Sequence, residues 1–195
     1  NPVFSSFSKK YIATIEFGDE TSTLDPEGEI VASAPVPTFD ALKAAVESFI
    51  GPQMQVPPLY SALHVDGKRA YEMARSGKEV EMEARPIEIY SIELLSYDGK
   101  VARVECHVSK GTYIRSLARD IGKAVGSMGV MSKLTRSASG IFTLENGVSV
   151  EEFKASSNPE KYLISPDLAI DFPKVVLTNN QATRILNGLF DRYDL

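Results

Sequence analysis

The residues best able to do chemistry in this sequence lie together in one segment, Ser109–Leu117. Gly111 permits a tight turn there, between a strand-like run and a helix-like run. Tyr113 offers an aromatic ring with a polar tip. Arg115 offers a fixed positive charge whose planar fork matches a carboxylate. The segment is typical of a binding site beside the start of a helix, and equally of a basic helix with a half-buried tyrosine.

Charge is segregated along the chain, although the net charge is only −5 at pH 7. Six acidic residues and no basic one lie between residues 16 and 29. Six basic residues and one acidic one lie between residues 110 and 136. A second basic group consists of Lys68, Arg69, Arg75, Lys78 and Arg85. This layout is typical of a protein with one electropositive face, and also of ordinary solvated helix surfaces.

Composition excludes several classes of protein. The chain has 195 residues, of which 43% are hydrophobic and 24% charged, as in a globular domain with at most a small appendage. Its single cysteine and two histidines argue against disulfides and a metal cage, so we expect no metal and a cytoplasmic location. No apolar run approaches the roughly 20 residues of a membrane span. Phosphate-binding glycine loops and the Gly-x-Ser-x-Gly motif are absent.

The spacing of apolar residues predicts the strands and helices that must position the segment 109–117. Residues 9–17 alternate as a half-buried strand, and the polar stretch that follows, up to residue 28, is interpreted as a loop. Asp98-Gly99 predicts a hairpin between strands 87–97 and 100–108, with Cys106 on the packed face rather than acting as a nucleophile. Helices are expected over 39–50, 69–76 and 112–125, with short capped helices after Ser149 and Thr178. These elements predict an α+β fold, with a largely antiparallel sheet flanked by helices.

A series of motifs runs from about residue 9 to residue 140. They are Lys10-Tyr11, Thr21-Ser22-Thr23 with Asp25-Pro26-Glu27-Gly28, Pro57-Pro58-Leu59-Tyr60-Ser61-Ala62-Leu63, Gly67-Lys68-Arg69-Ala70-Tyr71, Arg85-Pro86-Ile87, Lys110-Gly111-Thr112-Tyr113-Ile114-Arg115, and Leu134-Thr135-Arg136. In order and in spacing this series resembles the motifs of a known family, the TruB tRNA pseudouridine synthases with their Cbf5/dyskerin relatives. The resemblance implies the pseudouridine synthase fold, with a largely antiparallel mixed sheet.

The resemblance also implies an activity and the residues that perform it. The family isomerises one uridine of the tRNA T loop, at position 55, to pseudouridine without metal or organic cofactor, after flipping the base out of its stack. Tyr11 matches the tyrosine that stacks on the flipped base, Tyr113 a second pocket tyrosine, and Leu134 an apolar wall. Arg115 matches the arginine paired with the catalytic aspartate. Candidate RNA-binding residues are Lys68, Arg69, Lys110, Arg119 and Arg136.

One departure from the family concerns the nucleophile. The family's Gly-His-x-Gly-Thr-Leu-Asp-Pro segment precedes every motif seen here, so we expect it to lie before Asn1, leaving Arg115 without its intended carboxylate and the chain alone inactive. Asp25, within Thr23-Leu24-Asp25-Pro26, is interpreted as a turn residue rather than as the nucleophile. We expect residues 1–170 to form the catalytic domain and 171–195 the start of a truncated PUA-like domain.

Three hypotheses follow for function. The first is a synthase that acts as a monomer on the tRNA T arm, and in which the aspartate attacks either the base or the sugar. The second is a non-catalytic module that binds or folds tRNA. The third is a structural domain whose basic helices are merely solvated.

Overall fold

The computed structural model describes residues 2–61, 63–65, 68–69, 82–170 and 172–189. Contacts divide the chain into two compact units, 1–147 and 148–195, which are taken separately below. The predicted division at residue 170 concerns the identity of two domains, and it stays a prediction.

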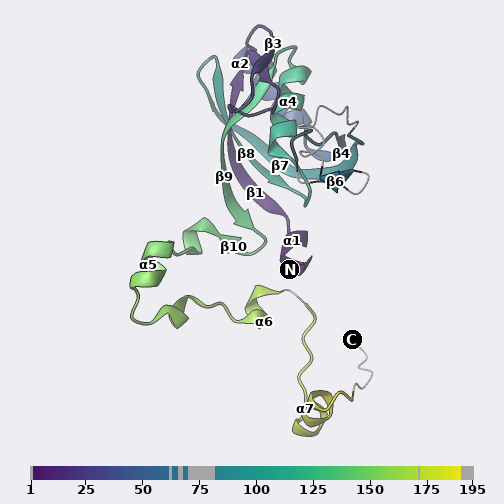
Figure 1. Ribbon diagram of the computed structural model, residues 1–195, viewed down its shortest axis with the longest axis vertical. Helices are drawn as coiled ribbons and strands as arrows, with labels where there is room; N and C mark the ends of the chain where they lie inside the picture. Colours follow the sequence, from purple (N-terminus) through teal and green to yellow (C-terminus); the bar gives the residue numbers. More distant parts are fainter. Residues whose placement is uncertain (1, 62, 66–67, 70–81, 171, 190–195) are drawn as a thin grey trace. The chain divides into compact units, whose positions relative to one another are not determined.

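The first unit is built on a six-stranded sheet in the order β10-β9-β1-β8-β7-β4 (Figure 1). Every pairing among the described strands is antiparallel, so the predicted largely antiparallel α+β fold is confirmed. The predicted hairpin joins β7 to β8 at Gly99, whose φ of 100° suits glycine. The strands are β1 (Lys9–Phe17), β4 (Gly51–Gln55), β7 (Arg85–Tyr97), β8 (Val101–Val108), β9 (Gly129–Ser139) and β10 (Phe142–Thr143).

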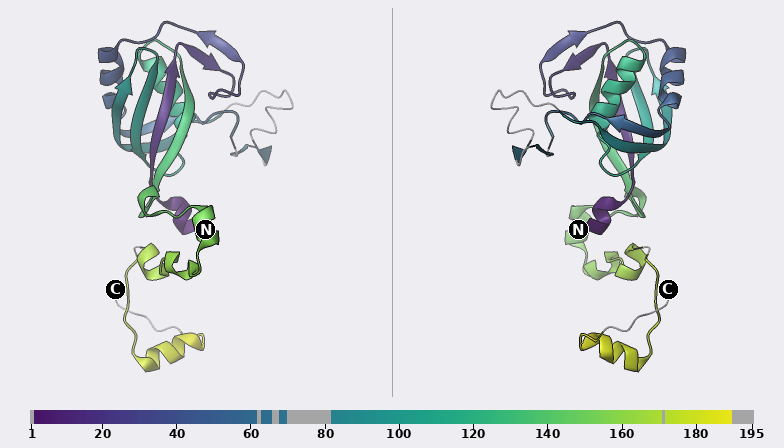
Figure 2. Two further views of the ribbon diagram at one scale, coloured as in Figure 1. Left: turned by 90° about the vertical axis from the view of Figure 1, so that its left-hand side faces the viewer. Right: turned by 90° about the vertical axis from the view of Figure 1, so that its right-hand side faces the viewer.

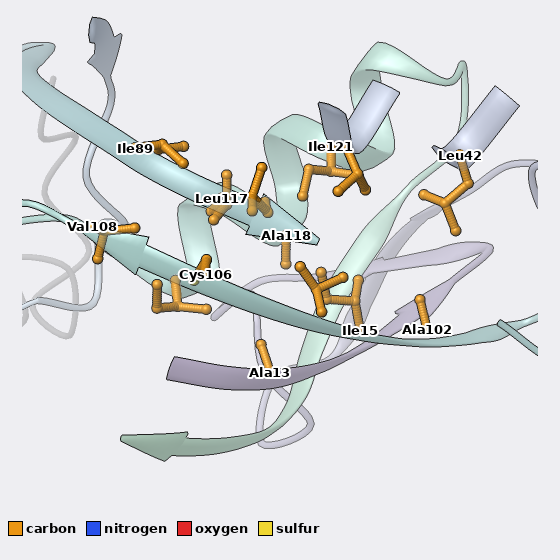
Figure 3. Packing of buried hydrophobic residues seen from close by; sticks show 14 of the residues in the cluster. Ala13, Ile15, Leu42, Ile89, Ala102, Cys106, Val108, Leu117, Ala118 and Ile121 are labelled. Atoms are coloured by element: carbon orange, nitrogen blue, oxygen red, sulfur yellow. The ribbon is translucent and has the colours of Figure 1, made fainter. Parts of the chain in front are cut away.

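One face of this sheet carries the core. Helix α2 (Phe39–Ser48) packs on β7, and α4 (Ile114–Ala124) packs across β9 and β1, so both cover the same face (Figure 2). Figure 3 shows Leu117, Ala118 and Ile121 of α4 pointing toward the strand residues Ala13 and Cys106. The helix expected over 112–125 and the packing role of Cys106 are therefore confirmed.

Two glycines allow α4 to lie directly against β9. A Cβ added to Gly122 would be 2.5 Å from the backbone nitrogen of Gly129. A Cβ added to Gly129 would be 2.4 Å from the carbonyl oxygen of Ala118. Real atoms do not approach this closely, so larger residues would push the helix away from the strand. The glycine pair thus sets the distance between the sheet and the helix that carries Arg115.

Short elements surround the sheet in the first unit. The stretch interpreted as a loop after β1 in fact contains β2 (Asp19–Thr21), which pairs with β3 (Ile30–Ser33), because a pairing partner can sit beyond an intervening turn. Residues 68–69 form β6, paired with β5 (His64–Val65), so the helix expected from residue 69 does not begin there; its remaining residues, 70–76, lie outside the described ones. Helix α1 (Pro2–Ser6) and the 3-10 turn η1 (Leu144–Asn146) are the other elements described in this unit.

The second unit consists of short helices. These are α5 (Val150–Ala155), η2 (Pro159–Tyr162), α6 (Pro166–Ala169) and α7 (Asn179–Leu186). The caps expected at Ser149 and Thr178 are present: each side-chain oxygen accepts a hydrogen bond from a backbone N–H three residues on. No helix among the described residues, in either unit, has the length and apolar character needed to cross a membrane.

Candidate active site

The turn between β8 and α4 is fastened to the neighbouring strand. Ser109 donates its backbone N–H to the carbonyl oxygen of Glu88 at 2.9 Å, and its hydroxyl accepts the N–H of Glu88 at the same distance. Thr112 donates its hydroxyl to the carbonyl oxygen of Ser109 at 3.0 Å. Gly111 has a φ of 81°, so the tight turn predicted at this residue is confirmed. The start of α4 is therefore held in a defined place relative to β7.

Arg115, in the first turn of α4, donates hydrogen bonds to two other segments of the chain. Its Nη1 donates to Asp25 Oδ2 at 2.8 Å and to the carbonyl oxygen of Thr23 at 3.1 Å. Its Nη2 donates to the carbonyl oxygen of Tyr60 at 2.7 Å. The guanidinium side chain is 23% exposed, so it is partly screened from water. Arg115 thus joins three segments that are remote in sequence.

Arg115 has a carboxylate partner among the described residues, although not the nucleophilic aspartate that the family resemblance implies. Asp25 is this partner because the turn after β2 folds back over the start of α4, 90 residues further along the chain. A pairing at such a distance leaves no local pattern, so inspection of the sequence missed it. Whether a second carboxylate approaches Arg115 is a separate question, and that pairing stays a prediction.

Asp25 itself is held by the turn it belongs to. Its Oδ1 accepts the hydroxyl of Thr23 at 2.6 Å and the backbone N–H of Glu27 at 3.1 Å, while its Oδ2 accepts Arg115. The carbonyl oxygen of Asp25 accepts the N–H of Gly28 at 3.3 Å, which closes the predicted turn. Both carboxylate oxygens are therefore engaged in holding the turn and the guanidinium.

Strand register brings three of the predicted residues onto one sheet face. In the β1–β9 pairing, Tyr11 lies opposite Arg136, and Ala13 lies opposite Leu134. Directly paired residues share a face, and residues two apart along a strand do too. Tyr11, Leu134 and Arg136 consequently lie on the face against which α4, with Arg115, is packed.

Three positive charges gather beside Tyr11. Burial lowers the pKa of Lys9, and the nearby charges of Arg136 and Lys110 lower it further. Lys9 also donates to the carbonyl oxygens of Ser5 and Phe7, at 2.7 and 2.5 Å, which anchors it to the segment before β1. Lys110 and Arg136 were predicted from the sequence as RNA-binding residues, but Lys9 was not, although it lies two residues before Tyr11 on the same strand face.

The other predicted RNA-binding residues are Arg119, Lys68 and Arg69. Arg119 donates to the carboxylate of Asp120 at 2.8 Å and to the carbonyl oxygen of Val56 at 3.0 Å. Part of its hydrogen-bonding capacity is thus used within the protein. Lys68 and Arg69 form β6, and their side chains lie outside what the structure describes.

Three cavities are described, and Tyr11, Tyr113, Arg115 and Leu134 line none of them. The largest of the three, about 610 Å³, opens on the opposite face of the sheet. The described residues also contain no cluster of three or more His, Cys, Asp or Glu side chains suited to a metal ion. The grouping of the site therefore depends on strand register and on the position of α4.

Comparison with known proteins gives a consistent result along most of the chain. The model of the TruB family pseudouridylate synthase N-terminal domain matches residues 2–114. The model of the tRNA pseudouridylate synthase B C-terminal domain matches residues 115–165.

Curated relatives carry the same name. The tRNA pseudouridine synthase B of Alkaliphilus oremlandii is 40% identical over 182 residues, which cover 92% of this chain and 61% of the relative. That of Aquifex aeolicus is 40% identical over 198 residues, covering 98% of this chain and 69% of the relative. The chain thus spans between three fifths and seven tenths of the length of these two relatives.

Solved structures with a similar fold include two Cbf5 complexes. A Cbf5-Nop10-Gar1 complex aligns with a TM-score of 0.54 and 26% identity, over 80% of this chain and 39% of that one. An archaeal box H/ACA Nop10-Cbf5 complex aligns with a TM-score of 0.54 and 23% identity, over 83% and 40%. The second likeness concerns the fold alone.

Proposed function

Because the chain belongs to the TruB family of pseudouridylate synthases, we propose that it acts in a tRNA pseudouridine synthase that isomerises the T-loop uridine at position 55. The observation that carries this proposal is the grouping of Tyr11, Leu134 and Arg136 on the sheet face covered by α4, the helix that follows its N-cap residue Tyr113 and contains Arg115. An aromatic ring, an apolar wall and a held guanidinium are the groups that a flipped pyrimidine and a nearby carboxylate require.

In this mechanism the uracil leaves its stack and lies on the ring of Tyr11, with Leu134 excluding water beside it. Unstacking costs a few kcal/mol, and stacking on an aromatic side chain returns about 1–3 kcal/mol. An aspartate from a segment before Asn1 attacks the base or the sugar. The N-glycosidic bond breaks, the base rotates, and a ring carbon bonds to the sugar. The bond to the aspartate then breaks, that carbon loses its proton and the freed ring nitrogen gains one, so the product is an isomer of the substrate.

Arg115 has the capacity to hold that aspartate as well as Asp25. Guanidinium has five N–H donors. In the described part of the chain, both donors of Nη1 and one of Nη2 have acceptors, which leaves one donor on Nε and one on Nη2. Two such donors suit a bidentate contact with one carboxylate. Asp25 then acts as the structural partner, and the second carboxylate is the reactive one.

The proposal includes the partner and the arrangement of the RNA. The protein acts as a cytoplasmic monomer on the T arm of tRNA, with no metal or organic cofactor. Lys9, Lys110 and Arg136 lie close enough to interact electrostatically, and they contact phosphates next to the flipped nucleotide. Arg119, Lys68 and Arg69 provide further RNA contacts. Residues 1–170 form the catalytic domain, and 171–195 begin a PUA-like domain.

The experiment measures pseudouridine formation in a T-arm stem-loop, using the protein at its full natural length. The wild type should form product, and Arg115→Ala and Tyr11→Ala should lose most of the turnover. Arg103→Ala is the control, because Arg103 lies on the opposite face of the sheet and lines the cavity there. Turnover of Arg115→Ala equal to that of the wild type would contradict the role given to Arg115.

The same experiment separates the two other hypotheses. Salt-dependent binding of the stem-loop by the wild type without any product would favour the non-catalytic tRNA-binding module. Absence of measurable binding at low salt would favour a structural domain with solvated basic helices.

A further inference from the structure

One buried side chain, Gln55, hydrogen-bonds to the backbone of a site residue through both the oxygen and the nitrogen of its amide. Gln55 ends the edge strand β4 (Figure 1) and is only 4% exposed. Its Oε1 accepts the N–H of Tyr113 at 2.8 Å, and its Nε2 donates to the carbonyl oxygen of Tyr113 at 3.2 Å. A single amide therefore brackets Tyr113 as a neighbouring strand residue would.

The bracketed residue is the one at which the chain changes from turn to helix. Tyr113 has an extended backbone, with φ of −97° and ψ of 114°, and its own side chain does not cap α4. Its carbonyl oxygen also accepts the N–H of Leu117 at 3.0 Å, a hydrogen bond of the first helical turn. The Gln55 amide thus holds the backbone of Tyr113. This fixes the direction of the Tyr113 side chain and the start of the helix that carries Arg115.

Side chains of α4 hydrogen-bond to the backbone of the segment after β4, and Gln55 at the end of β4 hydrogen-bonds to the backbone at the start of α4. Ser116 donates its hydroxyl to the carbonyl oxygen of Val56 at 2.8 Å, and Arg115 donates to that of Tyr60 at 2.7 Å. These side chains hold the segment, whereas Gln55 acts in the opposite direction and holds the helix start, which no other side chain in the described part of the segment does. Both a donor and an acceptor are needed at residue 55, and among uncharged side chains of this length only glutamine supplies them from one planar group.

We propose that Gln55 is a positioning residue for the isomerisation: its amide holds Tyr113 and the start of α4 in the orientation that the reaction needs. The inference rests on the proposed function and adds to it a residue to which no role in the site has been given. Reacting groups that are misplaced by about 1 Å can lose on the order of 100-fold in rate. Loss of the amide should therefore lower kcat and leave RNA affinity close to that of the wild type, because the buried Gln55 has almost no exposed surface with which to contact RNA.

The main test compares two glutamines on the same strand. Gln55→Met keeps the length of the side chain and removes both hydrogen bonds to Tyr113. Gln53→Met is the matched control, because the Gln53 amide donates to the carbonyl oxygen of Phe49, at the end of α2, and does not contact Tyr113. In multiple-turnover assays at saturating stem-loop, we expect kcat to fall at least about tenfold in Gln55→Met. Gln53→Met should stay within about twofold of the wild type.

A second variant keeps the test decisive if Gln55→Met folds poorly. Gln55→Glu retains the acceptor for the Tyr113 N–H, but when ionised it turns an oxygen toward the Tyr113 carbonyl. Burial raises the pKa of such a carboxyl, so its protonated, donating form should increase as the pH falls from about 8 to about 5.5. We expect the activity of Gln55→Glu relative to the wild type to rise over that range. Amide hydrogen exchange at Tyr113 should be slow in the wild type and faster in Gln55→Met.

The possible results distinguish the proposed function of the protein from the positioning role of Gln55. A wild type without product would contradict the proposed function, whatever the variants do. An active wild type with a folded Gln55→Met of equal kcat would overturn the positioning role alone. So would a Gln55→Glu variant whose pH profile is parallel to that of the wild type.

Discussion

Replacing Asp25 by asparagine tests the ion pair at the centre of the site. In the wild type, Asp25 Oδ1 accepts two donors from its own turn, and Oδ2 accepts Arg115 at 2.8 Å. Asparagine offers one oxygen and one NH₂ group. If the oxygen stays on the turn, the NH₂ faces the guanidinium, donor against donor, and the charged hydrogen bond is lost.

The size of the effect follows from the exposure of the pair. A hydrogen bond to a charged group contributes about 1.5–3 kcal/mol. The two side chains are 23% and 19% exposed, so water screens the pair in part. We therefore expect the free energy of unfolding to fall by about 1–2 kcal/mol. Arg115 keeps its contacts with the carbonyl oxygens of Thr23 and Tyr60, so turnover should fall roughly tenfold, equivalent to about 1.4 kcal/mol in the barrier.

Urea unfolding and single-turnover pseudouridine formation measure the two quantities. Asp19→Asn is the matched control, because the Asp19 carboxylate accepts the hydroxyl of Ser33 at 2.6 Å within the β2–β3 ribbon and does not contact Arg115. Complete loss of product in a folded, RNA-binding Asp25→Asn protein would refute the reasoning, since Asp25 would then behave as the nucleophile. Unchanged stability and turnover would show that the ion pair has no role.

Three further outcomes are expected. Gly122→Ala should destabilise the fold by about 1–3 kcal/mol in urea unfolding, because its Cβ would meet the Gly129 nitrogen at 2.5 Å; an unchanged midpoint would contradict this. Burial, and then the charge of Lys10, lower the pKa of His107 from 6.5, so the unfolded chain binds the proton more readily. Stability should therefore fall as the pH drops below about 6.5, and a melting series should show a smaller fall in His107→Gln. Burial raises the pKa of the Cys106 thiol to about 12, so a maleimide at about pH 8 should label it only after unfolding.

Local sequence patterns were sufficient to predict the main strands of the first unit. The alternation in residues 9–17 predicted the strand whose Ala13, Ile15 and Phe17 are buried. The Asp98-Gly99 pair predicted the β7–β8 hairpin. The same patterns missed β2, which is three residues long and pairs across a turn, because so short a strand has little periodicity.

The site was predictable only in part. Tyr11, Tyr113, Arg115 and Leu134 were named from motifs, and register then placed Tyr11 and Leu134 on one sheet face. Their chemical roles stay predictions. Lys9 was missed although it shares a strand face with Tyr11, because a lone lysine on a strand has many possible roles.

The sequence by itself determined which residues alternate, which turn residues join the strands and which family motifs are present, because each of these depends on neighbours a few positions apart. Only the tertiary structure decided which partners the key groups have. Asp25 meets Arg115 across 90 residues, and Gln55 meets Tyr113 across 58. Such contacts arise when strand pairing and the packing of α4 bring remote segments together, and no spacing along the chain encodes them.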